Sequence, residues 1–459
     1  MGRRRRFPSE PIDLEVSHLG PKGCGVGEHE GRSFMVRGAP PGSLVRVRPF
    51  KRKKGVVHAR RLEILREPPD AVVPRCEKFG LCGGCTLQEL PLESQRAARV
   101  EHVRSILEPL DGVRWQGVRG TDAAYGYRNK VELTFGASRF LSEVDHAAGK
   151  AIDGRFLGFH APGRFDRVVE ASRCELVTDG LNKIIACVQS FLMESAFEPW
   201  NPRQHTGFWR HMVLRESTLG ERLVVFYTAP PEDELGAQAE LQALADLLPD
   251  VSGVCWYVND RVADAAIGSC RAVLRGRAWI EEGLGSLRLR LGVESFFQTN
   301  TPGAEVLYEV VGEAVGRGER LLDLYSGIGS IGLFLADRFK EIVGVEIVEP
   351  AVEDARENAQ RNGIGHARFI AGPVEEIAEG LVADALVVDP PRAGLHPKAA
   401  RWLAGLEVAS TLVYVACNPA SLARDREILE AGGWKLEDVW CVDLFPQTGH
   451  MEAVGRFVR

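Results

Sequence analysis

The stretch RLLDLYSGIGS, residues 320–330, joins an apolar strand to a glycine-rich turn. Asp323 stands near the strand end, and Gly327 and Gly329 allow the chain to turn into a helix whose N-terminus faces a ligand. The next apolar strand reaches Glu346, 19 residues after Gly327, where a carboxylate can bind both ribose hydroxyls of a nucleoside. Because no second nucleotide-binding half follows, the pattern favours the single nucleoside of S-adenosylmethionine over NAD.

Apolar strands alternate with helical stretches on both sides of this turn, over residues 291–459. This alternation is typical of a parallel sheet covered by helices on both faces, so we expect an α/β, Rossmann-like domain. The last two strands, LEDVWCVDLFP and HMEAVGRFVR, have no helix between them. We therefore expect them to form an antiparallel hairpin at one edge of the sheet.

Chemically capable side chains follow several of these strands. Asp389 ends a strand in VVDPPRAGL, where two prolines fix the turn and leave the carboxylate at the rim. Cys417 ends the strand in LVYVACNPASLARD, and Glu452 begins the last strand, close to His450. Open α/β sheets bind ligands at this rim, which favours a nucleophilic Cys417 over an inert core thiol. Asp389 could instead serve only to cap its turn.

The chain has 459 residues, 45% hydrophobic and 26% charged, which suffices for about three domains. No apolar run approaches the roughly 20 residues that span a bilayer, and no apolar segment follows the basic N-terminus, so we expect a soluble, cytoplasmic protein. Ten cysteines do not suggest a disulfide framework in a chain of this size. No feature indicates an oligomer, and the monomer is the default expectation.

The net charge of -6 is unevenly distributed. Residues 1–66 contain 16 Lys and Arg against 6 Asp and Glu, so this segment carries +10 and the remainder -16. Short strands separated by Gly and Pro predict a small barrel over residues 11–66. In its cluster PFKRKKG, Phe50 can stack on a base while Lys51 to Lys54 hold phosphate. A solvated hairpin tip explains the same residues equally well.

Three cysteines lie within the segment CEKFGLCGGC: Cys76, Cys82 and Cys85. Three thiols on so short a loop are difficult to explain by packing and indicate a metal site. Cys174 is the preferred fourth ligand because it follows another polar turn, although Cys24 and Cys187 remain alternatives. Zinc and a four-iron cluster both accept four thiolates, and the spacing does not decide between them.

Between these regions the sequence predicts a helix over residues 94–110, with Val100, Val103, Leu107 and Leu110 on one face. Residues 125–289 read as mainly β, with two helical pieces. This middle region offers little chemistry of its own.

Five ordered motifs, SFFQTN, DLYSGIGS, DPPRAGL, VYVACNP and FPQTGHMEAV, resemble those of the RNA uracil-5-methyltransferases. The resemblance covers nearly the whole chain. It implies a TRAM-like, OB-like RNA-binding barrel at residues 1–66, a cysteine loop and linking helix at 67–118, a β-rich central domain at 119–290 and a class I methyltransferase domain at 291–459. It also implies that the four cysteines hold a four-iron four-sulfur cluster, with zinc the less favoured occupant, and that the helix near residues 94–110 packs with the catalytic domain.

Carried over by position, the resemblance makes Cys417 the nucleophile and Glu452 the base. It implies that five residues contact S-adenosylmethionine or line the shared pocket: Gln298, Tyr325, Gly327, Glu346 and Asp389. Phe296 would stack on the target base. Ser330, where many members have Asn, and Pro373, in place of a polar residue, depart from the family pattern and are expected to weaken cofactor binding.

The implied reaction is methylation of carbon 5 of a uridine in RNA. Carbon 5 becomes nucleophilic once a thiolate adds at carbon 6, and the target must be unstacked to be reached. The barrel and cysteine site favour ribosomal RNA, while similarly built members act on transfer RNA. The alternatives are an RNA cytosine-5-methyltransferase, which needs a second cysteine such as Cys441, and a non-catalytic RNA-binding protein.

Overall fold

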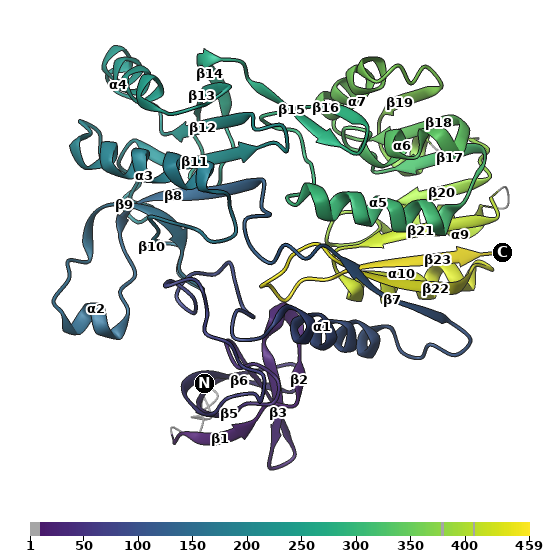
Figure 1. Ribbon diagram of the computed structural model, residues 1–459, viewed down its shortest axis with the longest axis horizontal. Coiled ribbons are helices and arrows are strands. Elements are labelled where there is room, and N and C mark those ends of the chain that lie inside the picture. The colour runs from purple at the N-terminus through teal and green to yellow at the C-terminus, as the bar shows by residue number, and fades with distance from the viewer. Residues whose placement is uncertain (1–9, 378–380, 407–408) are drawn as a thin grey trace, which may run out of the picture.

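The computed structural model describes residues 10–377, 381–406 and 409–459. Figure 1 shows an α/β body containing the C-terminus, a second β-rich body beside it, and a small β body near the N-terminus. Within these ranges, no helix is both long and apolar enough to cross a bilayer.

The α/β body is built on an eight-stranded sheet with the order β19-β18-β17-β20-β21-β23-β22-β7. Its strands are β7 (Arg114–Gly120), β17 (Gly318–Leu324), β18 (Phe339–Glu346), β19 (Ala367–Ala371), β20 (Ala385–Val388), β21 (Thr411–Ala416), β22 (Lys435–Asp443) and β23 (Glu452–Val458). β17 to β21 are mutually parallel, and β23 runs antiparallel to both of its neighbours. The predicted α/β fold is therefore present, with the polar strand ends gathered along one edge, here called the carboxyl edge.

Successive side chains of each strand enter opposite layers. Leu321 packs into the layer of α5 and α7, while Leu322 packs into the layer of α1, α9 and α10. Near-continuous apolar strands such as LVYVA are explained by this burial on both faces. The helices are α1 (Leu92–Leu107), α5 (Thr301–Val315), α6 (Ser330–Phe334), α7 (Glu349–Arg361), α8 (Val374–Ile377), α9 (Pro397–Gly405) and α10 (Pro419–Ala431).

The expected antiparallel hairpin is present as β22 and β23, but it does not form the sheet edge. β7 pairs in parallel with β22 and covers it. Arg114 of β7 forms a bidentate ion pair with Asp438 of β22, with Nε–Oδ1 and Nη2–Oδ2 distances of 2.8 Å. The prediction that this hairpin forms the edge of the sheet was wrong. β7 lies more than 300 residues before β22 in the sequence, and a local sequence pattern does not show such a distant pairing.

The second body is a seven-stranded sheet with the order β10-β9-β8-β11-β12-β13-β14. Val224 and Phe226 of β12 face α3 and α4, whereas Val225 and Tyr227 join the core of the α/β body. The elements are β8 (Lys130–Ser138), α2 (Glu143–Ala147), β9 (Asp153–His160), β10 (Val168–Glu170), α3 (Asp179–Glu194), β11 (Trp209–Glu216), β12 (Arg222–Thr228), α4 (Glu234–Leu247), β13 (Gly253–Val258) and β14 (Ser269–Gly276). A hairpin of β15 (Trp279–Leu284) and β16 (Leu287–Gly292) continues that shared core against α7.

The N-terminal body is a six-stranded sheet with the order β1-β5-β6-β4-β3-β2. Its strands are β1 (Ile12–Glu15), β2 (His18–Leu19), β3 (Gly25–His29), β4 (Arg32–Val36), β5 (Leu44–Lys53) and β6 (Val56–Arg66). Only Val16 and Ser17 separate β1 from β2, yet these strands lie at opposite ends of the order. The sheet therefore curls round on itself about a small apolar core that includes Leu14, Val36 and Val45.

Helix α1 ends earlier than its sequence pattern suggests. It stops at Leu107, because Glu108 precedes Pro109 and the residue before a proline disfavours helical geometry. Val103 and Leu107 enter the core of the α/β body, and α1 contacts both α10 and β2. The helix therefore lies between the N-terminal barrel and the eight-stranded sheet (Figure 1).

Candidate active site

Strand register brings the chemically capable residues together at the carboxyl edge. Ala416 of β21 pairs with Ala453 of β23, and Cys417 and Glu452 are the next residues of the two strands toward the carboxyl edge; the Glu452 carboxyl acts electrostatically on the Cys417 thiol. Val388 pairs with both Leu324 and Tyr414, so Asp389 follows on the neighbouring strand and Tyr325 on the one after it. Cys417 and Glu452, the candidate nucleophile and base, thus lie together at one end of this row of strand ends.

The Cys417 thiol is half-buried, and burial raises its pKa to about 11, with further contributions from Glu452 and Asp389. The guanidinium of Arg392 opposes this rise. Asn418 holds the turn by donating its Nδ2 hydrogen to the Arg392 carbonyl at 3.2 Å. A thiol in this setting is protonated at rest and has acid–base groups on two sides.

Glu452 is 2% exposed, and burial raises the pKa of its carboxyl to about 8, assisted by Asp389 and opposed by Arg392. Burial likewise raises the pKa of Asp389 to about 7. A carboxylate with a raised pKa accepts protons more readily than one in water, which suits a general base at neutral pH. His450 differs, since burial and nearby cations lower its pKa to about 4, which leaves it neutral.

The glycine-rich turn is organised around Glu346. Its Oε2 accepts the Gly327 N–H at 3.0 Å and its Oε1 accepts the Val348 N–H at 2.9 Å, which fixes the carboxylate beside the turn. Gly327 has φ 54°, a left-handed conformation that glycine adopts without strain. Tyr325, two residues earlier, has φ 62° despite its side chain; such strain is concentrated at functional sites.

Buried polar atoms beneath the turn lack partners. Asp323 is fully buried, its Oδ2 accepts the Gly332 N–H at 2.9 Å, and burial raises its pKa to about 7. Its Oδ1 and the Ser326 hydroxyl have no hydrogen-bond partner within the described ranges. Buried groups of this kind are ordinarily satisfied by a ligand or water, so the turn fits a bound polar cofactor.

The two departures from the family pattern have different settings. Ser330 begins α6, and its hydroxyl lies 3.0 Å from the hydroxyl of the buried Tyr308. Pro373 precedes α8, and its carbonyl accepts the N–H groups of Glu376 and Ile377 at 3.1 Å. Both residues thus have structural contacts of their own.

The segment SFFQTN is held by the second body. Asn129 donates its Nδ2 hydrogens to the Gln298 carbonyl at 2.9 Å and to the Thr301 hydroxyl at 2.8 Å. Gln298 is buried, whereas Phe296 is 67% exposed. An exposed phenyl ring on a fixed segment is available to stack on a base.

The four predicted ligand cysteines come together. Cys76, Cys82, Cys85 and Cys174 line one cavity of about 200 Å³, while Cys24 and Cys187 are not among its lining residues. Burial raises the pKa of each thiol, to about 11 for Cys82 and about 12 for Cys85, and the field of at least one other of these cysteines adds to the rise at Cys82, Cys85 and Cys174. Across the described chain, no three His, Cys, Asp or Glu side chains converge on the position of a single metal ion. Four thiols that line one cavity are a donor set that metals with a preference for sulfur accept.

The cluster PFKRKKG lies at the exposed end of the β5–β6 hairpin. Phe50 is 62% exposed, and the side chains of Lys51 to Lys54 are exposed around the turn. Phe50 and His58 lie side by side, with ring centroids 6.5 Å apart. The arrangement leaves an aromatic face and several cations open to solvent.

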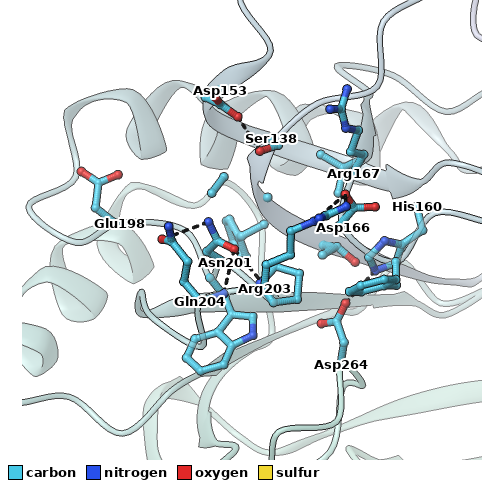
Figure 2. A pocket seen from close by; sticks show the side chains of 18 of the residues that line it. Ser138, Asp153, His160, Asp166, Arg167, Glu198, Asn201, Arg203, Gln204 and Asp264 are labelled. Atoms are coloured by element: carbon cyan, nitrogen blue, oxygen red, sulfur yellow. Dashed lines mark hydrogen bonds and ion pairs between the residues drawn. The ribbon is translucent and has the colours of Figure 1, made fainter.

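A separate cavity of about 620 Å³ lies over β8 and β9 of the second body (Figure 2). Its charges are largely paired, since Arg164 and Arg203 share Asp166, and Asp264 lies 3.1 Å from His160 and 2.9 Å from His211. It contains none of the residues that the sequence singles out for chemistry.

Two residues near the carboxyl edge, Arg392 and Tyr308, were not predicted from the sequence. Arg392 immediately follows the prolines after Asp389, and its place in that motif is the signal that could have identified it. Tyr308 lies within α5, where an aromatic residue at helical spacing reads as core. Its position among the buried carboxyls of Asp323, Asp389 and Glu452 depends on tertiary packing.

Comparison with known proteins identifies the group to which this architecture belongs. Residues 285–458 match the family model described as tRNA (Uracil-5-)-methyltransferase. The chain is 35% identical to an uncharacterized RNA methyltransferase of Caldanaerobacter subterraneus, covering 97% of this chain and 98% of that protein. A second, from Chlorobaculum tepidum, is 36% identical, covering 98% of this chain and 96% of that protein. The chain belongs to the RNA uracil-5-methyltransferase family.

The solved structure of a relative supports the same family over nearly the full length of the chain. The structure of Pyrococcus abyssi tRNA (uracil-54, C5)-methyltransferase in complex with S-adenosyl-L-homocysteine is 28% identical, covers 97% of this chain and 100% of that chain, and superposes with a TM-score of 0.76. The methyltransferase described here thus has an α/β class I fold with β-rich N-terminal regions. It is an S-adenosylmethionine-dependent RNA (uracil-5-)-methyltransferase.

Proposed function

We propose that this methyltransferase modifies a uridine of ribosomal RNA through a covalent adduct between Cys417 and carbon 6 of the base. The observation that carries the proposal is the meeting of three groups at the carboxyl edge: Cys417 and Glu452 adjoin the last pair of β21 and β23, and Glu452 and Asp389 both act electrostatically on the Cys417 thiol. Cys441, the second cysteine that a cytosine enzyme would need, is fully buried in the core, which supports uracil as the base.

In this mechanism the Cys417 thiol loses its proton as its sulfur bonds to carbon 6, and the ring becomes an enolate. S-adenosylmethionine supplies the methyl group that carbon 5 attacks. Glu452 then removes the carbon 5 proton, the electron pair restores the ring double bond, and the carbon 6–sulfur bond breaks to release the thiolate. The pKa of about 8 makes Glu452 a stronger base than an exposed glutamate.

The cofactor is held by Gln298, Tyr325, Gly327, Glu346 and Asp389. The two backbone N–H donors to Glu346 orient its carboxylate for the ribose hydroxyls, and the unpartnered atoms of Asp323 and Ser326 support a polar ligand at the turn. Phe296 stacks on the target base from outside, in keeping with its exposure.

Cys76, Cys82, Cys85 and Cys174 hold a four-iron four-sulfur cluster. Zinc, the less favoured occupant, would also accept four thiolates. A cavity shared by all four thiols is more suitable for a cluster. Because methyl transfer to uracil is redox-neutral, a cluster held by these cysteines would serve folding or RNA positioning rather than electron transfer.

Residues 1–66 act as a TRAM-like barrel that binds RNA through the β5–β6 hairpin, whose aromatic and cationic side chains are exposed. Residues 67–118, 119–290 and 291–459 are the cysteine loop with its linking helix, the central domain and the catalytic domain. The barrel and the cysteine site together favour ribosomal RNA. Transfer RNA is the second candidate, favoured by the similarity to the Pyrococcus abyssi enzyme.

The test is transfer of labelled methyl from S-adenosylmethionine to unmodified ribosomal RNA and, separately, to transfer RNA, followed by mass spectrometry of the nucleosides. 5-Methyluridine in ribosomal RNA alone supports the proposal. 5-Methyluridine in transfer RNA alone would replace the substrate but leave the mechanism standing. 5-Methylcytidine would overturn the assignment of the base.

A further inference from the structure

We propose that Gln95 and Arg99 of α1 are positioning residues for Glu452 and act through the segment 443–450, here called the edge loop. The proposal rests on the role of Glu452 as the base that releases the product. The edge loop joins β22 to β23 and ends two residues before Glu452. It contains no helix or strand after Asp443; hydrogen bonds of Thr448 with Phe445 and His450 form a local turn, and contacts from elsewhere in the chain hold the rest of its path.

Arg99 is 1% exposed and holds both ends of the edge loop. Its Nη1 and Nη2 hydrogens bind Asp443 Oδ1 and Oδ2 at 2.7 and 2.8 Å, a bidentate ion pair at the end of β22. The same Nη1 donates to the His450 carbonyl at 2.9 Å and to the Phe445 carbonyl at 3.3 Å. One planar guanidinium therefore sets the distance between the two ends of the loop.

Gln95, one helical turn earlier, holds the middle of the loop. Its Nε2 donates to Gln447 Oε1 at 3.0 Å and its Oε1 accepts the Gln447 N–H at 2.8 Å. Gln447 is buried and has φ 69°, an unfavourable conformation for a residue with a side chain. The reciprocal pair of hydrogen bonds with Gln95 stabilises that conformation.

Contacts from other parts of the chain also hold the edge loop. Together with those of Gln95 and Arg99 they are here called the clamp. The N–H groups of Thr86 and Leu87, which follow Cys85 directly, donate to the Gln447 carbonyl at 2.8 and 3.1 Å. The Tyr127 hydroxyl donates to the Pro446 carbonyl at 2.9 Å. Gly449 lies so close to Gly23 of the barrel that a Cβ atom at Gly449 would come within 2.1 Å of the Gly23 nitrogen.

Displacement of Glu452 should affect only the last step of the reaction, the breakdown of the adduct. Glu452 acts only after methyl transfer, so a displaced Glu452 slows proton removal from carbon 5 and breakdown of the adduct. Addition of Cys417 and methyl transfer do not require its carboxylate as the base. A misplacement of about 1 Å can cost roughly 100-fold in rate, which is large enough to measure.

The experiment follows methyl transfer and adduct breakdown separately in single turnovers of the full-length enzyme with labelled S-adenosylmethionine and its RNA. The variants are Gln95→Met and Arg99→Lys, and the matched control is Arg104→Ala, which removes an exposed arginine of the same helix that stacks on Trp115. Adduct breakdown should slow by about 10- to 100-fold in both variants, with methyl transfer within about twofold of wild type and the control unchanged.

Wild-type breakdown in both variants, or equal loss in both steps, overturns the proposal. If Arg99→Lys fails to fold, Gln447→Gly provides a second measurement, because glycine keeps the left-handed backbone while removing the carboxamide. Gln95→Met and Gln447→Gly should then be non-additive in a double-mutant cycle. Glu452→Gln separates the two hypotheses: if it traps no adduct, the base assignment fails, and if it does while the other variants release normally, only the positioning role fails.

Discussion

Three carboxyl groups beneath or along the carboxyl edge have raised pKa values, about 7 for Asp323, about 7 for Asp389 and about 8 for Glu452, mainly because burial disfavours their charged forms. Between the unfolded value near 4 and these folded values, the folded enzyme binds more protons than the unfolded chain. Its stability therefore falls as the pH rises through this window. The burial that raises the pKa values of these three carboxyls therefore lowers the stability of the fold.

We expect Glu452→Gln to trap the methylated RNA as a covalent adduct, visible on a denaturing gel. The same change should raise the melting temperature at pH 8, where the wild-type carboxyl is fully ionised in the unfolded chain but only half ionised in the fold, and have a much smaller effect at pH 5. Product release in wild type should rise with pH up to about 8. A variant that releases product normally would contradict the assignment.

Cys417→Ala should lower methyl transfer by about 10⁴-fold or more, because no other group can add to carbon 6. RNA and cofactor binding should persist. The matched control is Cys441→Ala, which removes a fully buried thiol of β22 from the core and should retain turnover. Near-normal turnover by Cys417→Ala would exclude the covalent mechanism.

S-adenosylmethionine carries a positive sulfonium, which favours the charged form of nearby carboxyls. At pH 6.5, where a carboxyl with a pKa of about 7 is roughly three-quarters protonated, we expect binding of S-adenosylmethionine to release up to about 0.75 proton. S-adenosylhomocysteine lacks the charge and should release fewer. Calorimetry in buffers of different ionisation enthalpy measures the difference, and equal proton release by the two ligands would place the sulfonium away from Asp389.

Among the elements, the strands of the eight-stranded sheet could be predicted because burial on both faces leaves apolar runs in the sequence. β7 could not, because its pattern RWQGVRG is half-exposed and polar, and its partner lies 324 residues away at the Arg114–Asp438 contact. Three of the four cysteines, Cys76, Cys82 and Cys85, were recognisable from their close spacing, but the cavity they share with Cys174 depends on tertiary structure.

The β5–β6 hairpin is the element whose charge should govern RNA affinity. Replacing Lys51 and Lys53 by Ala should weaken RNA binding and reduce the salt slope of log K by about 2, since each phosphate contact releases a counterion. Lys340→Ala is the matched control, because Lys340 is equally exposed but lies on β18 and pairs with Glu319. An unchanged slope would show that the hairpin tip is merely solvated.

Across the whole molecule, the edge loop is where the barrel, the cysteine segment, α1 and the second body meet. The sequence motifs suffice to propose Cys417 and Glu452 as nucleophile and base, because residue type and neighbouring residues carry that hypothesis. The clamp was not predictable, because Gln95 and Gln447 are ordinary polar residues until the fold brings them together across 352 positions.

The pairing of β7 with β22 also has a consequence in time. A ribosome that adds about 5–20 residues per second needs roughly 16–65 s to deliver Asp438 after Arg114. During synthesis β7 must therefore wait for its partner while nearly all of the remaining chain emerges. An apolar strand would risk pairing with a neighbouring chain during that interval, whereas a polar strand with arginines at both ends of RWQGVRG can remain in water. The polarity that makes β7 hard to predict from the sequence thus protects the nascent chain from pairing with its neighbours.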